Sequence, residues 1–204
     1  NSTVIEQKKN LRINLKEKLT ILENSPNTIK DCEKKISTIF FESSLFQEAD
    51  IILSFLSLKS EISTMQITKI CFENNKKIFV PRINDDNKTM TFYQLDKTKT
   101  IEAQTEKNIY HISEPLTTLP VLKKNNITEK TLLLIPGLAF SINGSRLGRG
   151  KGFYDCFLDS ISQCIKIGLC YSFQILNKIP SEKHDKKVDY LLTEKNLLLC
   201  KKEL

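Results

Sequence analysis

Residues 132–158, LLLIPGLAFSINGSRLGRGKGFYDCFL, constrain the fold more than any other part of the chain. Positions 132–135 form a run of four aliphatic residues bounded by a proline and a glycine, and such a run predicts a strand buried on both faces. A glycine-rich loop follows over 136–151. The apolar positions from Phe153 to Ile161 then recur with helical spacing. We therefore expect a strand, a basic loop and a helix in that order.

The loop has the chemistry of a polyphosphate site. Its glycines let backbone N–H groups approach phosphate oxygens, and the helix that follows supplies further N–H donors. Arg146, Arg149 and Lys151 place three cations within six residues. Asp155, about one helical turn further on, is the carboxylate that an accompanying Mg²⁺ would require. The spacing fits neither a P-loop nor a dinucleotide-binding fingerprint. The alternative is a basic loop that contacts only solvent.

Composition narrows the function classes. The 204 residues are enough for one domain with a substantial core, and we expect a single domain over 1–204. No apolar stretch is long enough for a membrane helix, and the polar first residues do not read as a signal peptide, so we expect a cytoplasmic protein without a membrane partner. The net charge of +7 comes from lysines scattered along the chain, which argues against a nucleic-acid partner. The six cysteines show no CxxC pair, and because most lie in apolar surroundings they are interpreted as small buried thiols.

The remaining pattern predicts an α/β fold. Helices are expected over 4–23, 28–49 and 61–74, and strands over 51–58, 77–81, 90–95, 165–170, 191–192 and 197–200. Residues 96–130 read as a loop-rich excursion with one short helix. Because helices alternate with apolar strands, we expect a three-layer sandwich with a largely parallel central sheet flanked by helices. Ligands in such folds bind at the carboxyl ends of the strands.

The string RLGRGKGFYD at 146–155 resembles the 5-formyltetrahydrofolate cyclo-ligase family, also called methenyltetrahydrofolate synthetases. Four further elements match that family in order: K-x-x-L-R at 8–12, E-x-x-T at 61–64, a PR turn with an M-x-F strand at 81–92, and a closing pattern that includes His184, Asp185 and Asp189. Two details depart from the family. Ser63 replaces an acidic residue, and Phe153 replaces a position that is often tyrosine.

The resemblance implies a set of site residues. The nucleotide-binding set is Lys8, Lys9, Asn10, Leu11, Arg12, Arg146, Leu147, Gly148, Arg149, Gly150, Lys151, Gly152, Phe153 and Tyr154. Arg146, Arg149 and Lys151 are the expected catalytic residues, and Asp155 and Asp185 the expected Mg²⁺ ligands. The substrate-binding set is Leu56, Glu61, Thr64, Arg82, Met90, Phe92 and Tyr154. For Met90 and Phe92, simple core packing is an equally good interpretation, and Lys8 with Arg12 could form a solvated basic face.

The resemblance also implies an activity. The expected reaction is the ATP- and Mg²⁺-dependent cyclisation of 5-formyltetrahydrofolate to 5,10-methenyltetrahydrofolate, through phosphorylation of the formyl oxygen, with ADP and phosphate released. The expected partner is therefore the small-molecule folate substrate, and the protein is expected to be a monomer. Two alternatives remain open at this point: another ATP-using kinase or ligase on the same scaffold, and a nucleic-acid-binding module.

Overall fold

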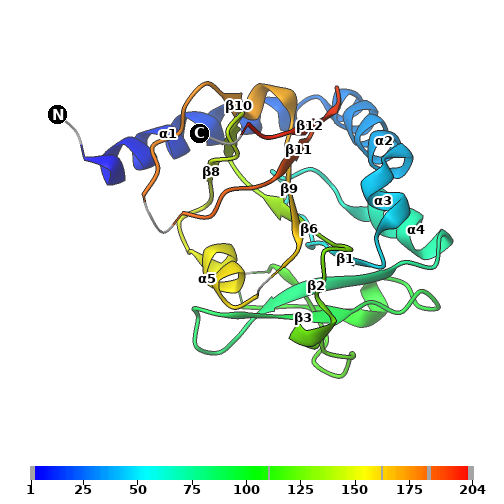
Figure 1. Ribbon diagram of the computed structural model, residues 1–204. Coiled ribbons are helices and arrows are strands. Elements are labelled where there is room, and N and C mark those ends of the chain that lie inside the picture. The colour runs from blue at the N-terminus through cyan, green and yellow to red at the C-terminus, as the bar shows by residue number, and fades with distance from the viewer. Residues whose placement is uncertain (1–2, 110, 162, 183–184, 202–204) are drawn as a thin grey trace.

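The computed structural model describes residues 3–109, 111–161, 163–182 and 185–201. Its centre is a seven-stranded sheet with the strand order β12-β11-β9-β6-β1-β2-β3 (Figure 1). The strands are β1 (Ile51–Leu53), β2 (Lys77–Ile83), β3 (Met90–Gln94), β6 (Thr131–Pro136), β9 (Ile165–Leu169), β11 (Tyr190–Leu192) and β12 (Leu197–Leu199). The five inner strands run parallel, whereas β3 and β12 pair antiparallel at the two edges. The predicted α/β class with a largely parallel sheet is confirmed.

The aliphatic run that opened the sequence analysis forms β6, the middle strand of the sheet. Leu132 and Leu134 face one apolar cluster, and Leu133 and Ile135 face the other. All four side chains are at most 1% exposed. A strand with apolar residues at every position suits this place, because both of its faces are covered.

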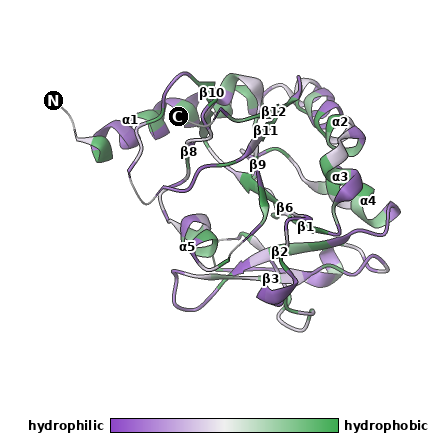
Figure 2. Cartoon of the chain, in the orientation of Figure 1, coloured by the Kyte–Doolittle hydropathy of each residue, from purple (hydrophilic) through white to green (hydrophobic). Residues whose placement is uncertain are grey.

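Helices cover both faces of the sheet (Figure 1). The helices are α1 (Val4–Glu23), α2 (Pro26–Glu42), α3 (Ser44–Glu48), α4 (Met65–Glu73) and α5 (Phe153–Asp159). Leu15 of α1, Phe40 of α2 and Ile67 of α4 pack on one face with Leu132, while Phe157 of α5 packs on the other. Figure 2 shows the strands of the centre as mainly hydrophobic and the helices as banded. The expected three layers are therefore present, with the α5 layer the smaller one.

The single helix predicted over 28–49 is wrong, because the chain breaks at Ser43. This residue has an extended backbone (φ −73°, ψ 144°), and its hydroxyl accepts a hydrogen bond from Phe46 N at 3.2 Å. A serine that caps a new helix in this way ends the preceding one. The segment therefore forms α2 and α3.

The strand predicted over 51–58 and the helix predicted over 61–74 are both shorter than expected. β1 ends at Leu53 and α4 begins at Met65. Between them, side chains bond the backbone: Thr64 Oγ1 donates to Phe55 O at 2.6 Å, and Glu61 Oε2 accepts from Leu58 N at 2.9 Å. These bonds close a loop at the carboxyl end of β1, which is where Glu61 and Thr64 lie.

Two segments predicted as loops contain small strands. Within 136–151 the chain forms a hairpin of β7 (Ala139–Ser141) and β8 (Arg146–Leu147), which β10 (Ile175–Leu176) extends. Within 96–130 it forms a second hairpin of β4 (Thr105–Lys107) and β5 (Ser113–Pro115) and short 3-10 turns. No helix in the described ranges is long and apolar enough to cross a membrane.

Candidate active site

The basic loop lies beyond the carboxyl end of β6 and runs from β8 into α5. Its backbone carries conformations that favour glycine. Gly150 has φ +97°, and Gly152, which precedes α5, has φ +72°. At Gly148 a Cβ atom would lie 2.7 Å from Arg146 Nη1, so no larger residue fits while that guanidinium keeps its place. The glycines thus permit a tight path close to charged side chains, as the sequence predicted.

Helix α1 contacts this loop although it is far away in the sequence. Arg12 Nε donates a hydrogen bond to Gly148 O at 3.0 Å, and the Arg12 guanidinium lies about 3.5 Å from the place that a Cβ atom on Gly150 would take. Lys8, one turn earlier on the same face, is 7% exposed. The structure therefore brings Arg12 to the loop and buries Lys8 beside it on α1, whereas Lys9 and Asn10 are exposed.

Lys8 bridges two carboxylates of the chain's last third. Its Nζ lies 2.7 Å from Asp185 Oδ2 and 2.9 Å from Glu182 Oε2. Burial alone would lower the pKa of Lys8, but the hydrogen bonds to Asp185 and Glu182 outweigh it and raise the pKa. Lys8 is therefore held as a cation beside one of the two predicted metal ligands. Glu182 was not predicted from the sequence.

The other predicted metal ligand, Asp155, sits in the first turn of α5. Its Oδ2 accepts from Arg146 Nη2 at 3.1 Å and its Oδ1 accepts from Lys186 N at 3.0 Å. Because Lys186 follows Asp185 directly, this bond brings the segment of Asp185 to the start of α5. The Arg146 guanidinium also lies over the ring of Tyr154, 5.6 Å from its centroid.

Arg149 joins the loop to the segment after β1. Its Nε donates to Glu61 Oε1 at 3.1 Å, and its Nη2 donates to Ser60 Oγ at 2.7 Å. Burial, followed by the charge of Glu61, raises the pKa of Tyr154 far above its usual range, so Tyr154 stays neutral beside this pair. Residues predicted for the nucleotide and for the folate are thus in direct contact.

Lys151 differs from the two arginines of the loop. Its side chain is exposed and makes no hydrogen bond or ion pair with any residue that the structure describes. The neighbouring Phe153 is partly buried and packs against the apolar cluster on the α5 face. Leu147 is 1% exposed, so its side chain belongs to the core, and its backbone pairs with β7.

A pocket of about 380 Å³ opens beside Glu61. Three predicted substrate residues, Leu56, Glu61 and Thr64, line it. Thr64 is 3% exposed, and its hydroxyl is bonded to Phe55 O and close to Ser57 Oγ, so it mainly shapes the wall. Further lining residues were not predicted from the sequence: Glu33 of α2, Tyr171 after β9, and Ile101, Glu102, Thr105 and Ser113 around the β4–β5 hairpin. No motif distinguishes these positions in the sequence.

The remaining predicted substrate residues lie outside the lining of this pocket. Arg82 of β2 donates to Pro115 O at 3.0 Å and pairs with Glu106, so it attaches the β4–β5 hairpin to the sheet. Met90 and Phe92 of β3 are 8% and 2% exposed and belong to the core on the α5 face. The Phe92 ring packs on that of Phe157, with 4.7 Å between centroids. For Met90 and Phe92 the structure favours the packing interpretation.

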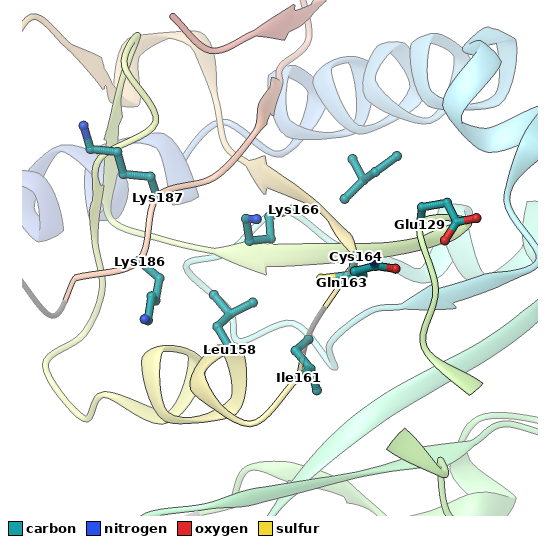
Figure 3. A pocket seen from close by; sticks show the side chains of 9 residues that line it. Glu129, Leu158, Ile161, Gln163, Cys164, Lys166, Lys186 and Lys187 are labelled. Carbon is teal, nitrogen blue, oxygen red and sulfur yellow. The ribbon is translucent and has the colours of Figure 1, made fainter. Parts of the chain in front are cut away.

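A second groove, of about 560 Å³, is lined from α5, from the start of β9 and from the segment before β11 (Figure 3). Its side chains include Lys166, Lys186, Lys187 and Cys164. No residue of the predicted site lines it. Lys166 pairs with Asp189, Lys186 pairs with Asp159, and Lys187 also has a partner, so all three cations are already engaged. His184 of the closing family pattern lies outside the described residues.

Comparisons with known proteins agree on one family. The family model described as "5-formyltetrahydrofolate cyclo-ligase family" matches residues 4–194. A mouse 5-formyltetrahydrofolate cyclo-ligase is 31% identical over 202 residues, covering 94% of this chain and 96% of the mouse protein. A mitochondrial 5-formyltetrahydrofolate cyclo-ligase from Arabidopsis thaliana is 29% identical, covering 94% of this chain and 75% of the plant protein.

Solved structures support the same conclusion for the fold. The NMR structure of the 5,10-methenyltetrahydrofolate synthetase from Aquifex aeolicus superposes with a TM-score of 0.79 at 24% identity, covering 97% of this chain and 94% of the other. The synthetase from Mycoplasma pneumoniae gives a TM-score of 0.71 at 20% identity, covering 92% and 98%. Together with the matching motifs at 8–12, 61–64 and 146–155, these findings establish that the chain belongs to the 5-formyltetrahydrofolate cyclo-ligase family.

Proposed function

We propose that the protein closes the ring of 5-formyltetrahydrofolate to give 5,10-methenyltetrahydrofolate, with ATP and Mg²⁺ and with release of ADP and phosphate. The observation that carries this proposal is the bond between Arg149 of the basic loop and Glu61 at the pocket. It supports two adjoining compartments, one for a polyphosphate and one for a flat organic substrate. Such a contact suits an enzyme that transfers a phosphoryl group from one ligand to the other.

The chemistry explains why the site is rich in cations. The formyl oxygen is a poor leaving group until it carries the γ-phosphoryl group of ATP. The neighbouring aryl-amine nitrogen then attacks the formyl carbon, and the carbon–oxygen bond breaks to release phosphate. Phosphoryl transfer depends on positioning and on charge neutralisation more than on a protein nucleophile.

The roles of the residues follow from their positions. Arg12 and Lys8 on α1 would bind the triphosphate from one side, and Arg146 and Arg149 from the loop side. Lys151 is exposed and unpaired among the described residues, so it is available to reach the γ-phosphoryl group. Arginine and lysine are suited to these roles because they form charge-assisted hydrogen bonds to phosphate oxygens.

Asp155 and Asp185 fit the place of a Mg²⁺ ion. Mg²⁺ is commonly held by one or two carboxylates together with substrate phosphates and waters, and these are two carboxylates whose chain segments meet beside the loop. When bound, the ion would neutralise charge on the phosphates.

The decisive experiment follows the methenyl product. The purified protein is mixed with 5-formyltetrahydrofolate, ATP and Mg²⁺, and the absorbance of the methenyl group is recorded. We expect product only when all three are present. A protein that hydrolyses ATP with another acid or amide but leaves 5-formyltetrahydrofolate unchanged would contradict the proposal. Salt-sensitive binding to nucleic acid without ATP turnover would favour the nucleic-acid alternative.

A further inference from the structure

The pocket beside Glu61 carries a second carboxylate that the proposed reaction has not yet used. Glu61 itself is committed, because Oε1 accepts from Arg149 and Oε2 accepts from Leu58 N. A ligand must therefore share an oxygen that Glu61 already uses. Two other acidic side chains line the pocket: Glu33 of α2, which is partly exposed, and Glu102, which is exposed.

Glu33 is fixed in place and keeps one oxygen available. Its Oε1 accepts a hydrogen bond from Ser63 N at 3.0 Å, which anchors the side chain to the loop before α4. Within the described part of the chain Glu33 has no ion-pair partner, and no hydrogen bond reaches its Oε2. The side chain is partly exposed and lines the pocket. A carboxylate oxygen without a partner, on the wall of a pocket, is an acceptor for a ligand N–H group.

Tyr171, which follows β9 and is far from Glu33 in the sequence, supports the position of Glu33 in the pocket. It lines the same pocket and is 5% exposed. Burial raises the pKa of Tyr171 above its usual range, and the charge of Glu33 adds to this effect. The neutral phenol and the carboxylate of Glu33 therefore share one environment inside the pocket.

The substrate has the complementary groups. The aminopyrimidinone ring of a reduced folate presents N–H donors, among them the 2-amino group, and a carboxylate oxygen accepts a hydrogen bond from such a donor. We propose that Glu33 is a specificity-determining residue whose Oε2 accepts from the 2-amino group, while Glu61 stays paired with Arg149. This inference rests on the function proposed above.

The test uses Glu33→Gln, which keeps an oxygen for Ser63 N and removes the charge. We expect the KM for 5-formyltetrahydrofolate to rise about 10- to 100-fold, because one charge-assisted hydrogen bond is lost. The KM for ATP and kcat should stay within about twofold, since Glu33 does not contact the basic loop. Glu42→Gln, an exposed glutamate on the same helix, is the matched control and should leave all three constants unchanged.

A folate analogue without the 2-amino group separates recognition from a general disturbance of the pocket. Wild-type protein should bind the analogue more weakly than the parent compound, and Glu33→Gln should bind the two equally. An unchanged KM for 5-formyltetrahydrofolate in Glu33→Gln would overturn the inference. So would equal discrimination against the analogue by both proteins, or a parallel loss in kcat and in the KM for ATP. Failure of the proposed function itself has a different signature, which is a wild-type protein that forms no methenyl product.

Discussion

Arg149 and Glu61 are 88 positions apart in the sequence, yet Arg149 Nε lies 3.1 Å from Glu61 Oε1. The arginine comes from the loop before α5, and the glutamate from the loop after β1. Both loops lie at the carboxyl ends of the sheet strands, because β1 and β6 are neighbours that run in the same direction. The pair connects the two halves of the candidate site.

This pair should matter more for activity than for stability. Arg149 is about a third exposed, so Arg149→Gln should change the free energy of unfolding by no more than about 1 kcal/mol. The same variant should lower kcat/KM for 5-formyltetrahydrofolate about 10- to 100-fold, because an arginine at the phosphate loop is lost. Thermal unfolding and steady-state kinetics give the two values. A loss of stability that accounts for the whole loss of activity would contradict the proposed role.

Lys151→Ala isolates the one loop cation without a partner among the described residues. We expect the barrier of the reaction to rise by roughly 2–4 kcal/mol, as for removal of a single transition-state contact. Thermal stability should not change, because the exposed side chain makes no hydrogen bond or ion pair with the described residues. Lys130→Ala, an exposed lysine just before β6, is the control and should retain full activity. Unchanged turnover in Lys151→Ala would remove this residue from the mechanism.

Asp155→Asn tests the metal assignment. The amide keeps the shape of the side chain and weakens it as a Mg²⁺ ligand, so a higher Mg²⁺ concentration should be needed for half-maximal activity. Titration of Mg²⁺ at fixed ATP measures this shift. If the variant loses stability but keeps the same Mg²⁺ requirement, Asp155 serves only to hold Arg146 and the backbone of Lys186.

Phe92→Ala distinguishes packing from substrate contact. Phe92 is 2% exposed and packs against Phe157, so the variant should lose about 3–5 kcal/mol in the free energy of unfolding. At a temperature where it remains folded, its KM for 5-formyltetrahydrofolate should match that of the wild type. Chemical denaturation and kinetics at low temperature separate the two effects. A raised KM with unchanged stability would restore Phe92 to the substrate site.

The cysteines should differ in reactivity with pH. Burial raises the pKa of Cys71 to about 12 and the pKa of Cys164 and Cys200 to about 11, so at pH 8 few of these thiols are ionised. Cys156 on α5 is exposed. Iodoacetamide at pH 8 should therefore modify Cys156 first, and the rates for Cys164 and Cys200 should continue to increase up to about pH 11. Peptide mass spectrometry resolves the sites. Equal rates at all positions would indicate that the buried thiols are reached through unfolding.

The sequence predicted the framework well because its signals are local. A run of four aliphatic residues suits a strand that is covered on both faces, and β6 is such a strand. The glycines of 146–152 also predicted a tight loop, because they permit backbone conformations that other residues disfavour. The cations of the same segment predicted a binding site for an anion. The family motif identified Lys8 and Arg12. Their contacts with Asp185 and Gly148 form only in the folded chain, so the sequence could not predict them.

Other features depend on contacts that no local pattern encodes. Glu61 looked like the first turn of a helix, but its carboxylate caps Leu58 N instead, so α4 starts four residues later. The sequence suggested that Ser43 lies within a helix, but its side chain caps the start of α3. Glu33 has the appearance of an ordinary surface residue of an amphipathic helix, and it becomes a pocket residue only because the 56–64 loop folds over α2.

The position of β6 in the sheet also has a consequence for biosynthesis. β1 and β9 meet only through β6, which begins at residue 131, so a chain growing on the ribosome can assemble β3, β2 and β1 but leaves one edge of β1 open. That edge is apolar on both faces, with Ile51, Ile52 and Leu53 all buried in the finished protein. Nascent chains that already include β3 but not yet β6 therefore expose an apolar strand edge, and we expect chaperones to act on them.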